Sequence, residues 1–334
     1  MPVLYLIEQG STLRKDGDVF VVSKDDAVLK EIHAIEVEQI IIFGRITLTT
    51  PVIDYILQKG IDCVFCNSYG KFHGRLISNE SAHGNLRLKQ AEMILNVDRK
   101  LDCARAIIQG KVHNQRTIML RYRRENNLTQ LEQTIEMLEN TLRKITECWE
   151  IASLQGLEGS SSASYYQSFK AILKNKMGFS ARVRRPPTDP VNSLLSFGYT
   201  LLAYNIQSAV GIVGLDPFLS FVHSIEQSRP GLALDLMEEF RPIIVDSMVL
   251  WLVNTGVMTE LDFERPEQSG EMVAIKPESI KKLIHYYELK VQSKIYHPAA
   301  GGQTSYRHCF ELQARELAKV ILGQKSDYSP FQVR

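Results

Sequence analysis

The stretch IIIFGRITLTTPVIDYILQKGIDCVFCNSYGKFHGRL, residues 40–76, alternates short apolar runs with turn residues and holds one helical segment. The apolar runs are rich in β-branched and aromatic residues, which favour strands, and Gly, Asn and Ser separate them. Pro51 suits the first turn of a helix and Gly60 suits its end. The stretch therefore predicts a single helix with strands on both sides.

The same strand pattern fills roughly the first 80 residues. Because regular helical crossovers do not separate these strands, a doubly wound parallel sheet is not expected. After His83 the apolar residues recur at helical spacing, and LTQLEQTIEMLENTLRKITECWEIA, residues 128–152, predicts one long amphipathic helix. We predict an α+β protein: a small, sandwich-like N-terminal β domain with one helix, residues 1–83, and a larger all-α catalytic domain, residues 84–334.

The composition is that of an ordinary globular protein, with 44% hydrophobic and 23% charged residues among 334. The 39 basic residues nearly balance the 38 acidic ones, so any contact with nucleic acid must come from local patches. The cysteine spacing and the absence of a signal-peptide pattern favour free thiols in a reducing cytoplasm. No apolar run reaches ~18 residues, so we expect no membrane span.

Cys63 and Cys66 form a lone C-x-x-C motif. A redox or zinc site is one interpretation, but a zinc site needs about four ligands and the chain has no second cysteine pair. The favoured alternative is that IDCVFC, residues 61–66, is a buried strand.

Three polar stretches in the helical part could carry chemistry. The first, LQGLEGSSSASYYQSF, places Glu158 between two glycines and ahead of small residues and the pair Tyr165 and Tyr166. Small residues allow another helix or a ligand to approach closely. A solvated acid is the default interpretation of Glu158 on this evidence alone.

The second stretch, RVRRPPTDPVNSLLSFGYTLLAYNI, begins with Arg182, Arg184 and Arg185 ahead of two prolines. The prolines keep these arginines out of a helix interior. A helix then starts near Asp189 and carries Asn192. Arginine forks match phosphate oxygens, so a phosphate clamp and a solvated basic loop are both open interpretations.

The third stretch, HSIEQSRPGLALDLMEEFRP, residues 223–242, sets three acids among leucines. On a helix, Asp235, Glu238 and Glu239 share one broad face. Charges are rarely buried unless they are paired or bind a metal.

His223, at the end of the preceding helix, can meet the start of this acidic helix. Histidine with carboxylates is a ligand set for Mn²⁺ or Mg²⁺. A core histidine beside a salt bridge from Arg229 or Arg241 is the alternative, and spacing alone leaves both open.

Together these segments resemble the CRISPR-associated integrases, the metal-dependent endonucleases of spacer acquisition. The motifs that carry the resemblance are GLEGSSSASYY, DPVNSLLSFGYTLL, GLDPFLSFVH and LALDLMEEFRP. The segment at residues 40–76 is also similar to the strand-helix-strand segment of that family. The motifs stand in the family's order and cover nearly the whole chain.

The resemblance implies an enzyme that inserts new spacers into a CRISPR array, in which a DNA 3′-hydroxyl attacks a phosphodiester. It implies that Glu158, His223 and Glu238 hold Mg²⁺ or Mn²⁺. Asp235 would complete the catalytic set as a supporting acid or alternate ligand, and helix phase suggests that Glu239 pairs with a nearby arginine.

The resemblance also implies double-stranded DNA partners (spacer precursor and repeat array), a homodimer, the small second adaptation protein and a prokaryotic cytoplasm, with no membrane. The N-terminal domain would carry the dimer and partner contacts. Two alternatives stay open: a catalytically silent DNA-binding scaffold of the adaptation complex, and a metal nuclease of DNA repair. We expect DNA contacts from Arg182, Arg184, Arg185, Arg229, Arg241, Asn192 and Tyr165, the last by positioning a strand or stacking on a base.

Overall fold

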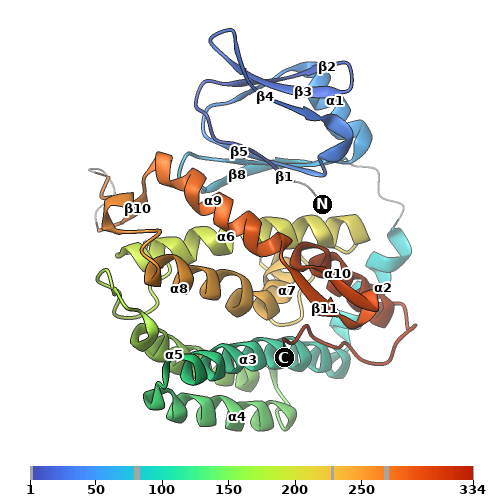
Figure 1. Cartoon of the computed structure of the whole chain (residues 1–334). Coiled ribbons are helices and arrows are strands. Elements are labelled where there is room, and N and C mark those ends of the chain that lie inside the picture. The colour runs from blue at the N-terminus through green and yellow to red at the C-terminus, as the bar shows by residue number, and fades with distance from the viewer. Residues whose placement is uncertain (1–2, 79–82, 227–228, 267–270, 334) are drawn as a thin grey trace. The chain divides into compact units, whose positions relative to one another are not determined.

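The computed structural model describes residues 3–78, 83–226, 229–266 and 271–333. The chain divides into two compact units, residues 1–82 and residues 83–334. The first unit is built mainly of strands and the second mainly of helices (Figure 1). The predicted α+β class is confirmed.

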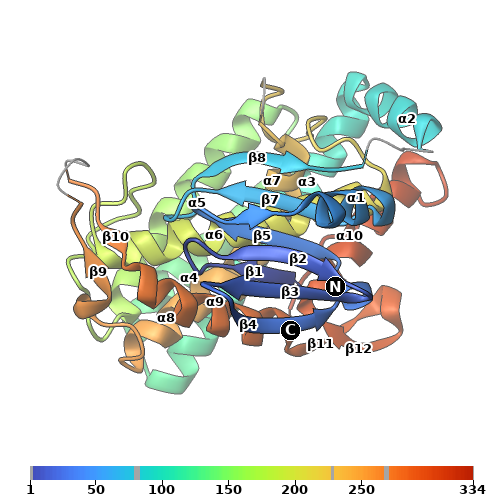
Figure 2. The same cartoon turned by 90° about the horizontal axis from the view of Figure 1, so that it is seen from above.

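Within residues 3–78 there are two four-stranded sheets, with strand orders β1-β5-β7-β8 and β4-β3-β2-β6. Figure 1 shows them as two layers, and Figure 2 shows their strands from above. The elements are β1 (Val3–Leu6), β2 (Thr12–Asp16), β3 (Val19–Lys24), β4 (Ala27–His33), a 3-10 turn (Ala34–Glu36), β5 (Gln39–Phe43), β6 (Thr47–Leu48), α1 (Thr50–Lys59), β7 (Asp62–Cys66) and β8 (Phe72–Leu76).

The helix predicted inside residues 40–76 is α1. Pro51 stands in its first turn, and Gly60 closes it in the left-handed conformation with φ 65°. α1 links β5 to β7, which pair in parallel, while β8 returns antiparallel to β7. The apolar side of α1, with Val52 and Ile56, completes the core of this unit together with Leu13, Phe20 and Ile40.

The C-x-x-C motif lies on β7, as the buried-strand interpretation predicted. Both thiols are buried, and burial raises the pKa of Cys63 to about 12. Beside them Asp62 accepts a hydrogen bond from Gln39 at 2.7 Å and pairs with Arg75. Cys63 therefore belongs to the core of this strand and is a poor nucleophile.

The second unit is helical, with two short β-hairpins that the sequence did not suggest. Its elements are α2 (Gly84–Leu95), α3 (Val97–Asn126), a 3-10 turn (Thr129–Leu131), α4 (Glu132–Thr146), α5 (Ile151–Ile172), α6 (Pro190–Val213), α7 (Gly231–Arg241), a π-helical turn (Pro242–Asp246), α8 (Ser247–Asn254), a 3-10 turn (Glu260–Asp262), β9 (Phe263–Glu264), β10 (Ala274–Ile275), α9 (Pro277–Gln292), β11 (Lys294–His297), a 3-10 turn (Pro298–Ala300), β12 (Gly302–Ser305) and α10 (Tyr306–Ile321).

The long helix predicted for residues 128–152 is interrupted. In the structure α4 ends at Thr146, and the next helix, α5, begins at Ile151. The break is stabilised from another helix, because Arg105 of α3 donates from Nε to the carbonyl of Cys148 at 2.8 Å. A donor from a distant part of the chain replaces the intrahelical hydrogen bond, and periodicity cannot reveal such a donor.

In the part of the chain that the structure describes, every helix is too short or too polar to cross a membrane.

Candidate active site

Three helices of the second unit bring charged side chains to one point. Glu158 projects from α5, Glu238 from α7 and Lys111 from α3, and α3 packs against both other helices. The Lys111 Nζ atom lies 2.7 Å from Glu238 Oε2 and also contacts Glu158 Oε1. The Lys111 residue is only 4% exposed. One buried ammonium therefore joins two carboxylates that are 80 positions apart in the sequence (238 minus 158).

Both carboxylates are held in the charged form. Burial alone would raise the pKa of Glu158, but the Lys111 ammonium more than offsets it, and the pKa lies below its usual value. Burial acts in the same direction on Glu238. There the Arg241 guanidinium, whose Nη1 is 2.5 Å from Oε1, and the Lys111 ammonium hold the pKa far below its usual range. The site is thus a pair of anions that needs a cation.

His223 is oriented by Asp235. The imidazole Nδ1 lies 2.6 Å from Asp235 Oδ1, and the same carboxylate accepts hydrogen bonds from the main-chain N–H groups of Phe221, Val222 and His223. Asp235 is fully buried, while the His223 side chain is 23% exposed. With Nδ1 turned toward the carboxylate, Nε2 is the nitrogen left for a ligand, an arrangement typical of metal-binding histidines.

Both carboxylate oxygens of Asp235 thus take part in hydrogen bonds within the protein. Its geometry fits the supporting role predicted for it better than the role of an alternate ligand.

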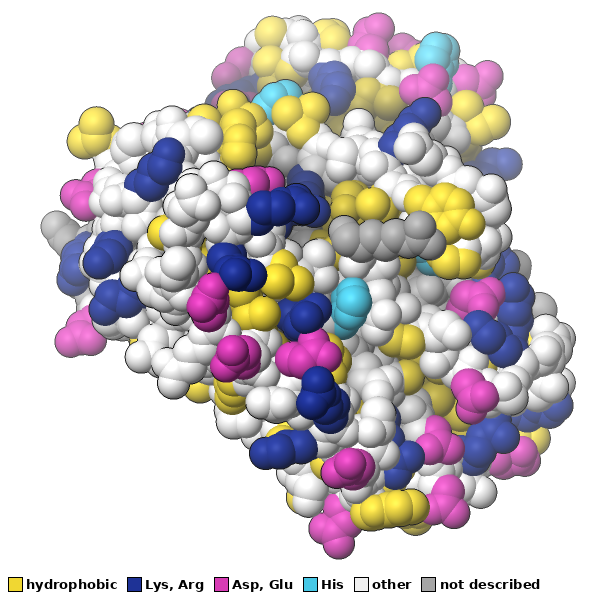
Figure 3. All heavy atoms as spheres, turned by 60° about the horizontal axis from the view of Figure 1, so that its bottom comes forward, with side chains coloured by type: hydrophobic (Ala, Val, Ile, Leu, Met, Phe, Trp, Pro, Cys, Tyr) yellow, Lys and Arg dark blue, Asp and Glu magenta, His cyan; other side chains and the backbone are white. Residues whose placement is uncertain are grey.

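A hollow of about 510 Å³ borders Glu158. Glu158, Ser162 and Tyr166 follow one another at intervals of four residues, so they share one face of α5 and line the hollow together. Its other wall is the arginine loop, with Arg182 and Arg184. On the face drawn in Figure 3, basic, acidic and histidine side chains gather around a depression. Two guanidinium groups on one wall can bind phosphate oxygens, and a carboxylate on the facing wall can bind the same phosphate through a metal ion.

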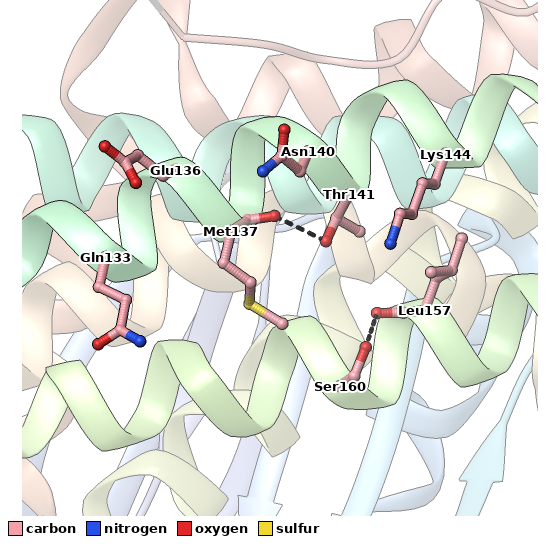
Figure 4. A pocket seen from close by; sticks show the side chains of 8 residues that line it. All are labelled: Gln133, Glu136, Met137, Asn140, Thr141, Lys144, Leu157 and Ser160. Atoms are coloured by element: carbon pink, nitrogen blue, oxygen red, sulfur yellow. Dashed lines mark hydrogen bonds between the residues drawn. The ribbon is translucent and has the colours of Figure 1, made fainter.

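A second hollow, of about 300 Å³, lies between α4 and α5. Figure 4 shows Leu157 and Ser160 of α5 facing Met137 and Thr141 of α4. The hydroxyl of Thr141 donates to the carbonyl of Met137 at 2.9 Å, and that of Ser160 donates to Leu157 at 3.0 Å. Because these hydroxyl donors are used within their own helices, the hollow beside Glu158 is the better candidate for chemistry.

The predicted DNA-contacting residues divide into two groups. Arg184 and Arg185 are exposed, Arg182 is half-buried, and Arg229 makes only a loose contact of 3.4 Å with Glu226. Arg184, Arg185 and Arg229 are therefore placed to meet an anion, whereas Arg182 lines the hollow and donates to Val183, Asn192 and Ser196.

Asn192 belongs to the second group because it is buried. Its Oδ1 accepts hydrogen bonds from Arg182 Nη1 at 2.8 Å and from the main chain of Val183 at 3.0 Å. It also donates to the carbonyl of Ala181. Asn192 therefore shapes the arginine loop, which corrects the expectation that it would contact DNA itself.

Tyr165 is buried as well, and Arg241 is half-buried. The Arg241 guanidinium binds Glu238 and lies 4.2 Å from the centre of the Tyr199 ring. Tyr165 is 0% exposed, so no base can stack on its ring in this structure, whereas its neighbour Tyr166 lines the hollow. The expectation that Tyr165 would contact DNA is therefore corrected. Adjacent residues point to different sides of a helix, so only one of the two tyrosines can face the hollow.

The Tyr166 hydroxyl lies 2.6 Å from that of Tyr199, which in turn hydrogen bonds to the buried Asp246. Burial raises the pKa of Asp246 to about 6. Asp246 lies in the π-helical turn that follows α7, a feature often found near functional sites. A buried polar network thus runs from the hollow toward the guanidinium that binds Glu238.

Among the described residues, the partners of Glu239 do not include the arginine that was predicted. Its carboxylate accepts hydrogen bonds from Tyr328 at 2.7 Å, from Gln313 at 3.0 Å and from the main chain of Phe331 at 2.7 Å. Burial raises the pKa of Glu239 to about 8. Glu239 anchors the irregular C-terminal tail against α7, so it is a structural acid.

The side chains around Lys111 are of the types that bind a divalent ion. Two ionised carboxylates share one cation, and His223 is close enough to help lower the pKa of Glu238. Among the described residues, however, no three His, Cys, Asp or Glu side chains stand in the geometry of a metal centre. The Lys111 ammonium is the cation that these carboxylates hold in the structure.

Lys111 is the residue that sequence reasoning missed, although the sequence carries a signal for it. The apolar side of α3 includes Leu101, Ala104 and Ile108 at intervals of three and four, and the next position in that series is Lys111. A lysine on the buried side of an amphipathic helix must have an anionic partner. That rule could have led from Lys111 to the acids of α5 and α7.

Comparison with known proteins identifies the family. The family model described as CRISPR associated protein Cas1 matches residues 4–289 of this chain. A relative from Thermus thermophilus, named CRISPR-associated endonuclease Cas1 3, is 33% identical over 334 residues, which cover 99% of this chain and 97% of the relative.

Two solved structures share the fold. A chain of a Cas6-RT-Cas1–Cas2 complex superposes with a TM-score of 0.85 at 25% identity, over 98% of this chain and 36% of that longer one. A casposase bound to integration product superposes with a TM-score of 0.86 at 23% identity, over 100% of this chain and 95% of the casposase. On the strength of the matching family description and of the Thermus relative, the chain belongs to the CRISPR-associated Cas1 family of endonucleases.

Proposed function

We propose that this chain is a metal-dependent DNA integrase and endonuclease that inserts new spacers into a CRISPR array. The observation that carries the proposal is the shared hollow, in which Glu158, one of two ionised carboxylates bound to the same cation, faces Arg182 and Arg184. This arrangement suits a phosphodiester, whose charge the arginines match and whose reaction needs a cation beside the carboxylates.

The similarity in fold to a casposase bound to integration product supports integration as the reaction. The similarity to the Cas1-containing chain of a complex that also holds Cas2 supports a small second adaptation protein as partner. Both are properties of those proteins, and we extend them to this chain as part of the proposal.

In the proposed reaction, a DNA 3′-hydroxyl attacks the phosphorus of a target phosphodiester, and the 3′-oxygen of the target strand leaves and takes up a proton. One phosphodiester forms as one breaks, so no nucleotide is consumed. When water replaces the attacking hydroxyl, the same step is endonucleolytic cleavage.

Glu158, Glu238 and His223 would hold Mg²⁺ or Mn²⁺, which supplies charge stabilisation to the phosphoryl oxygens and lowers the pKa of the nucleophile. Asp235 keeps His223 in the orientation that presents Nε2.

The substrate is double-stranded DNA, namely the spacer precursor and the repeat array. Arg182 and Arg184 would bind the phosphate in the hollow, while Arg185 and Arg229 would contact the flanking backbone. Tyr166, which lines the hollow, takes the strand-positioning role first expected of Tyr165.

We further propose that the chain acts as a homodimer in the prokaryotic cytoplasm and that its first unit, taken as residues 1–83, provides the dimer and partner contacts. β4 is an edge strand of its sheet. Val28 and Leu29 on β4 are each 50% exposed, and Ile35 just after it is 87% exposed. Exposed apolar side chains on and beside an edge strand favour contact with another chain.

An integration assay tests the function. Labelled duplex DNA, supercoiled target bearing a repeat, the purified partner and Mn²⁺ or Mg²⁺ should give joined product, and EDTA should abolish it. Glu158→Gln and Glu238→Gln should remove joining yet retain DNA binding, because the arginines remain. Glu150→Gln, at the exposed start of α5, is the matched control and should join DNA normally.

Two outcomes would replace the proposal. Wild-type protein that binds the duplex but never joins or cuts it would be a silent scaffold. Wild-type protein that cuts DNA without joining it to the repeat would fit a repair nuclease.

A further inference from the structure

Lys111 is a buried charge with two anionic partners. It is 4% exposed, its Nζ atom lies 2.7 Å from Glu238 Oε2, and it contacts Glu158 Oε1 as well. A buried ammonium is tolerated only when ion pairs and hydrogen bonds compensate for lost hydration. Lys111 and the two carboxylates therefore stabilise one another inside the protein.

The main chain that carries Lys111 is fixed on both sides. Gly110 lies so close to the C-terminal tail that a Cβ atom there would come within 2.7 Å of Pro330. Asn114, one turn later, donates to the carbonyls of Glu239 at 2.7 Å and of Phe331 at 2.8 Å. Only the flexible side chain of Lys111 can therefore move, and its four-carbon stem gives the ammonium that freedom.

The carboxylate oxygens that Lys111 contacts have room for another cation in place of the ammonium. Glu238 Oε2 meets Lys111 as an ion contact but receives no hydrogen bond of good geometry, whereas Glu238 Oε1 is bound by Arg241. Glu158 Oε1 also accepts a hydrogen bond from Ser162 at 2.9 Å, which would remain if the ammonium left.

We propose that Lys111 is an internal counter-ion of Glu158 and Glu238, which competes with the divalent ion for these carboxylates. In the absence of metal the ammonium, together with the Arg241 guanidinium on Glu238, neutralises the pair, and the ammonium keeps α3, α5 and α7 together. When metal binds, the ammonium moves away from the shared oxygens, because two cations at one pair of oxygens repel each other. This inference rests on the proposed metal-dependent function and adds a positioning residue to it.

Lys111→Met tests the competition, since methionine matches the stem of lysine and lacks its charge. Mn²⁺ affinity is measured by isothermal titration calorimetry, and thermal unfolding is measured in EDTA and in Mn²⁺. We expect Lys111→Met to bind Mn²⁺ about tenfold tighter or more, because no ammonium has to be displaced. We also expect it to unfold at a lower temperature than wild type in EDTA and to recover in Mn²⁺.

Lys111→Gln keeps hydrogen-bond donors for the carboxylates and serves if the methionine variant does not fold in EDTA. Lys100→Met, on the same helix and ~16 Å away at 1.5 Å per residue, is the matched control and should behave as wild type.

Mn²⁺ affinity that is equal to or weaker than wild type in both Lys111 variants would overturn the inference while leaving the metal site intact. Failure of wild type itself to bind Mn²⁺ would overturn the proposed metal site, and the counter-ion inference with it. Tighter binding together with metal-dependent recovery of stability supports the inference.

Discussion

Asp235→Asn is the most informative single change, because it keeps shape and removes charge. Asp235 accepts four hydrogen bonds, three from the main-chain N–H groups of residues 221–223 and one involving His223 Nδ1, with two on each oxygen. An asparagine keeps one oxygen and presents an NH₂ group in place of the other. If the NH₂ group replaces Oδ2, two main-chain donors lose their acceptor; if it replaces Oδ1, the main-chain N–H of His223 loses its acceptor while Nδ1 can accept instead. At ~1–3 kcal/mol for each donor left without an acceptor, we expect a loss of ~1–6 kcal/mol in the free energy of unfolding.

The same change should disturb the orientation of His223. If the new amide donates to Nδ1, the imidazole must carry its proton on Nε2, which is then unable to bind a metal. We expect Mn²⁺ affinity to fall ~10–100-fold, the usual effect of losing a supporting carboxylate. Urea unfolding in EDTA and calorimetric Mn²⁺ titration measure the two effects separately.

Asp216→Asn is the matched control, because Asp216 accepts one main-chain hydrogen bond, from Phe218 at 2.8 Å, that the asparagine oxygen can keep. It should change the free energy of unfolding by less than ~0.5 kcal/mol. If Asp235→Asn were as stable as this control and bound Mn²⁺ as wild type does, the role assigned to Asp235 would be refuted.

Two further predictions concern the C-terminal tail and its surroundings. Glu239→Ala leaves the Tyr328 hydroxyl and the Phe331 N–H without an acceptor, because the Gln313 amide keeps Tyr328 and Ser329 as acceptors. It should cost ~2–6 kcal/mol in urea unfolding at pH 7, whereas Glu239→Gln can still accept from Gln313 and Phe331 and should cost far less; equal losses would contradict the anchoring role. Burial lowers the pKa of His297, so the unfolded chain takes up a proton below about pH 6.5 that the folded state resists. The contribution of His297 to stability therefore falls as the pH drops from 7.5 to 5.5, opposite in sign to the contributions of Glu239 and Asp246. The stability of His297→Gln relative to wild type should thus rise over this interval, even if the variant is less stable at both pH values; a difference that does not change with pH would contradict the assignment.

The sequence predicted the architecture well where local rules decide it. Pro51 and Gly60 marked the ends of α1, and the change from strand to helical spacing separated the two parts of the chain. The buried strand of Cys63 followed from its β-branched and aromatic neighbours. The continuous helix predicted for residues 128–152 failed because its interruption depends on Arg105, a donor from elsewhere in the chain.

The candidate site was predictable only in part. Spacing placed Asp235 and Glu238 on one face of α7, and the resemblance to a family joined them to Glu158 and His223. Neither spacing nor the resemblance predicted that Asp235 would accept hydrogen bonds from the main chain of the preceding loop. Lys111 lies outside the motifs that carry the acids and the histidine, so spacing within those motifs did not point to it, although a lysine on the buried side of α3 requires an acid nearby.

The different roles of the arginines could not be predicted from the sequence either. Arg182, Arg184 and Arg241 look equivalent in a sequence, since each is a cation near a motif. The structure separates them by exposure and by partner: Arg184 is exposed, Arg182 lines the hollow and donates to Asn192, and Arg241 is bound to Glu238. Which guanidinium is free to meet DNA depends on tertiary contacts that spacing does not encode.

The central claim is that Glu158, Glu238 and His223 form one metal-dependent strand-transfer centre. The most direct test is the rate at which wild type and His223→Ala join a labelled duplex to supercoiled target in Mn²⁺, with DNA affinity measured in parallel. We predict that His223→Ala binds the duplex as wild type does and forms no joined product. Joining by His223→Ala at the wild-type rate would contradict the account.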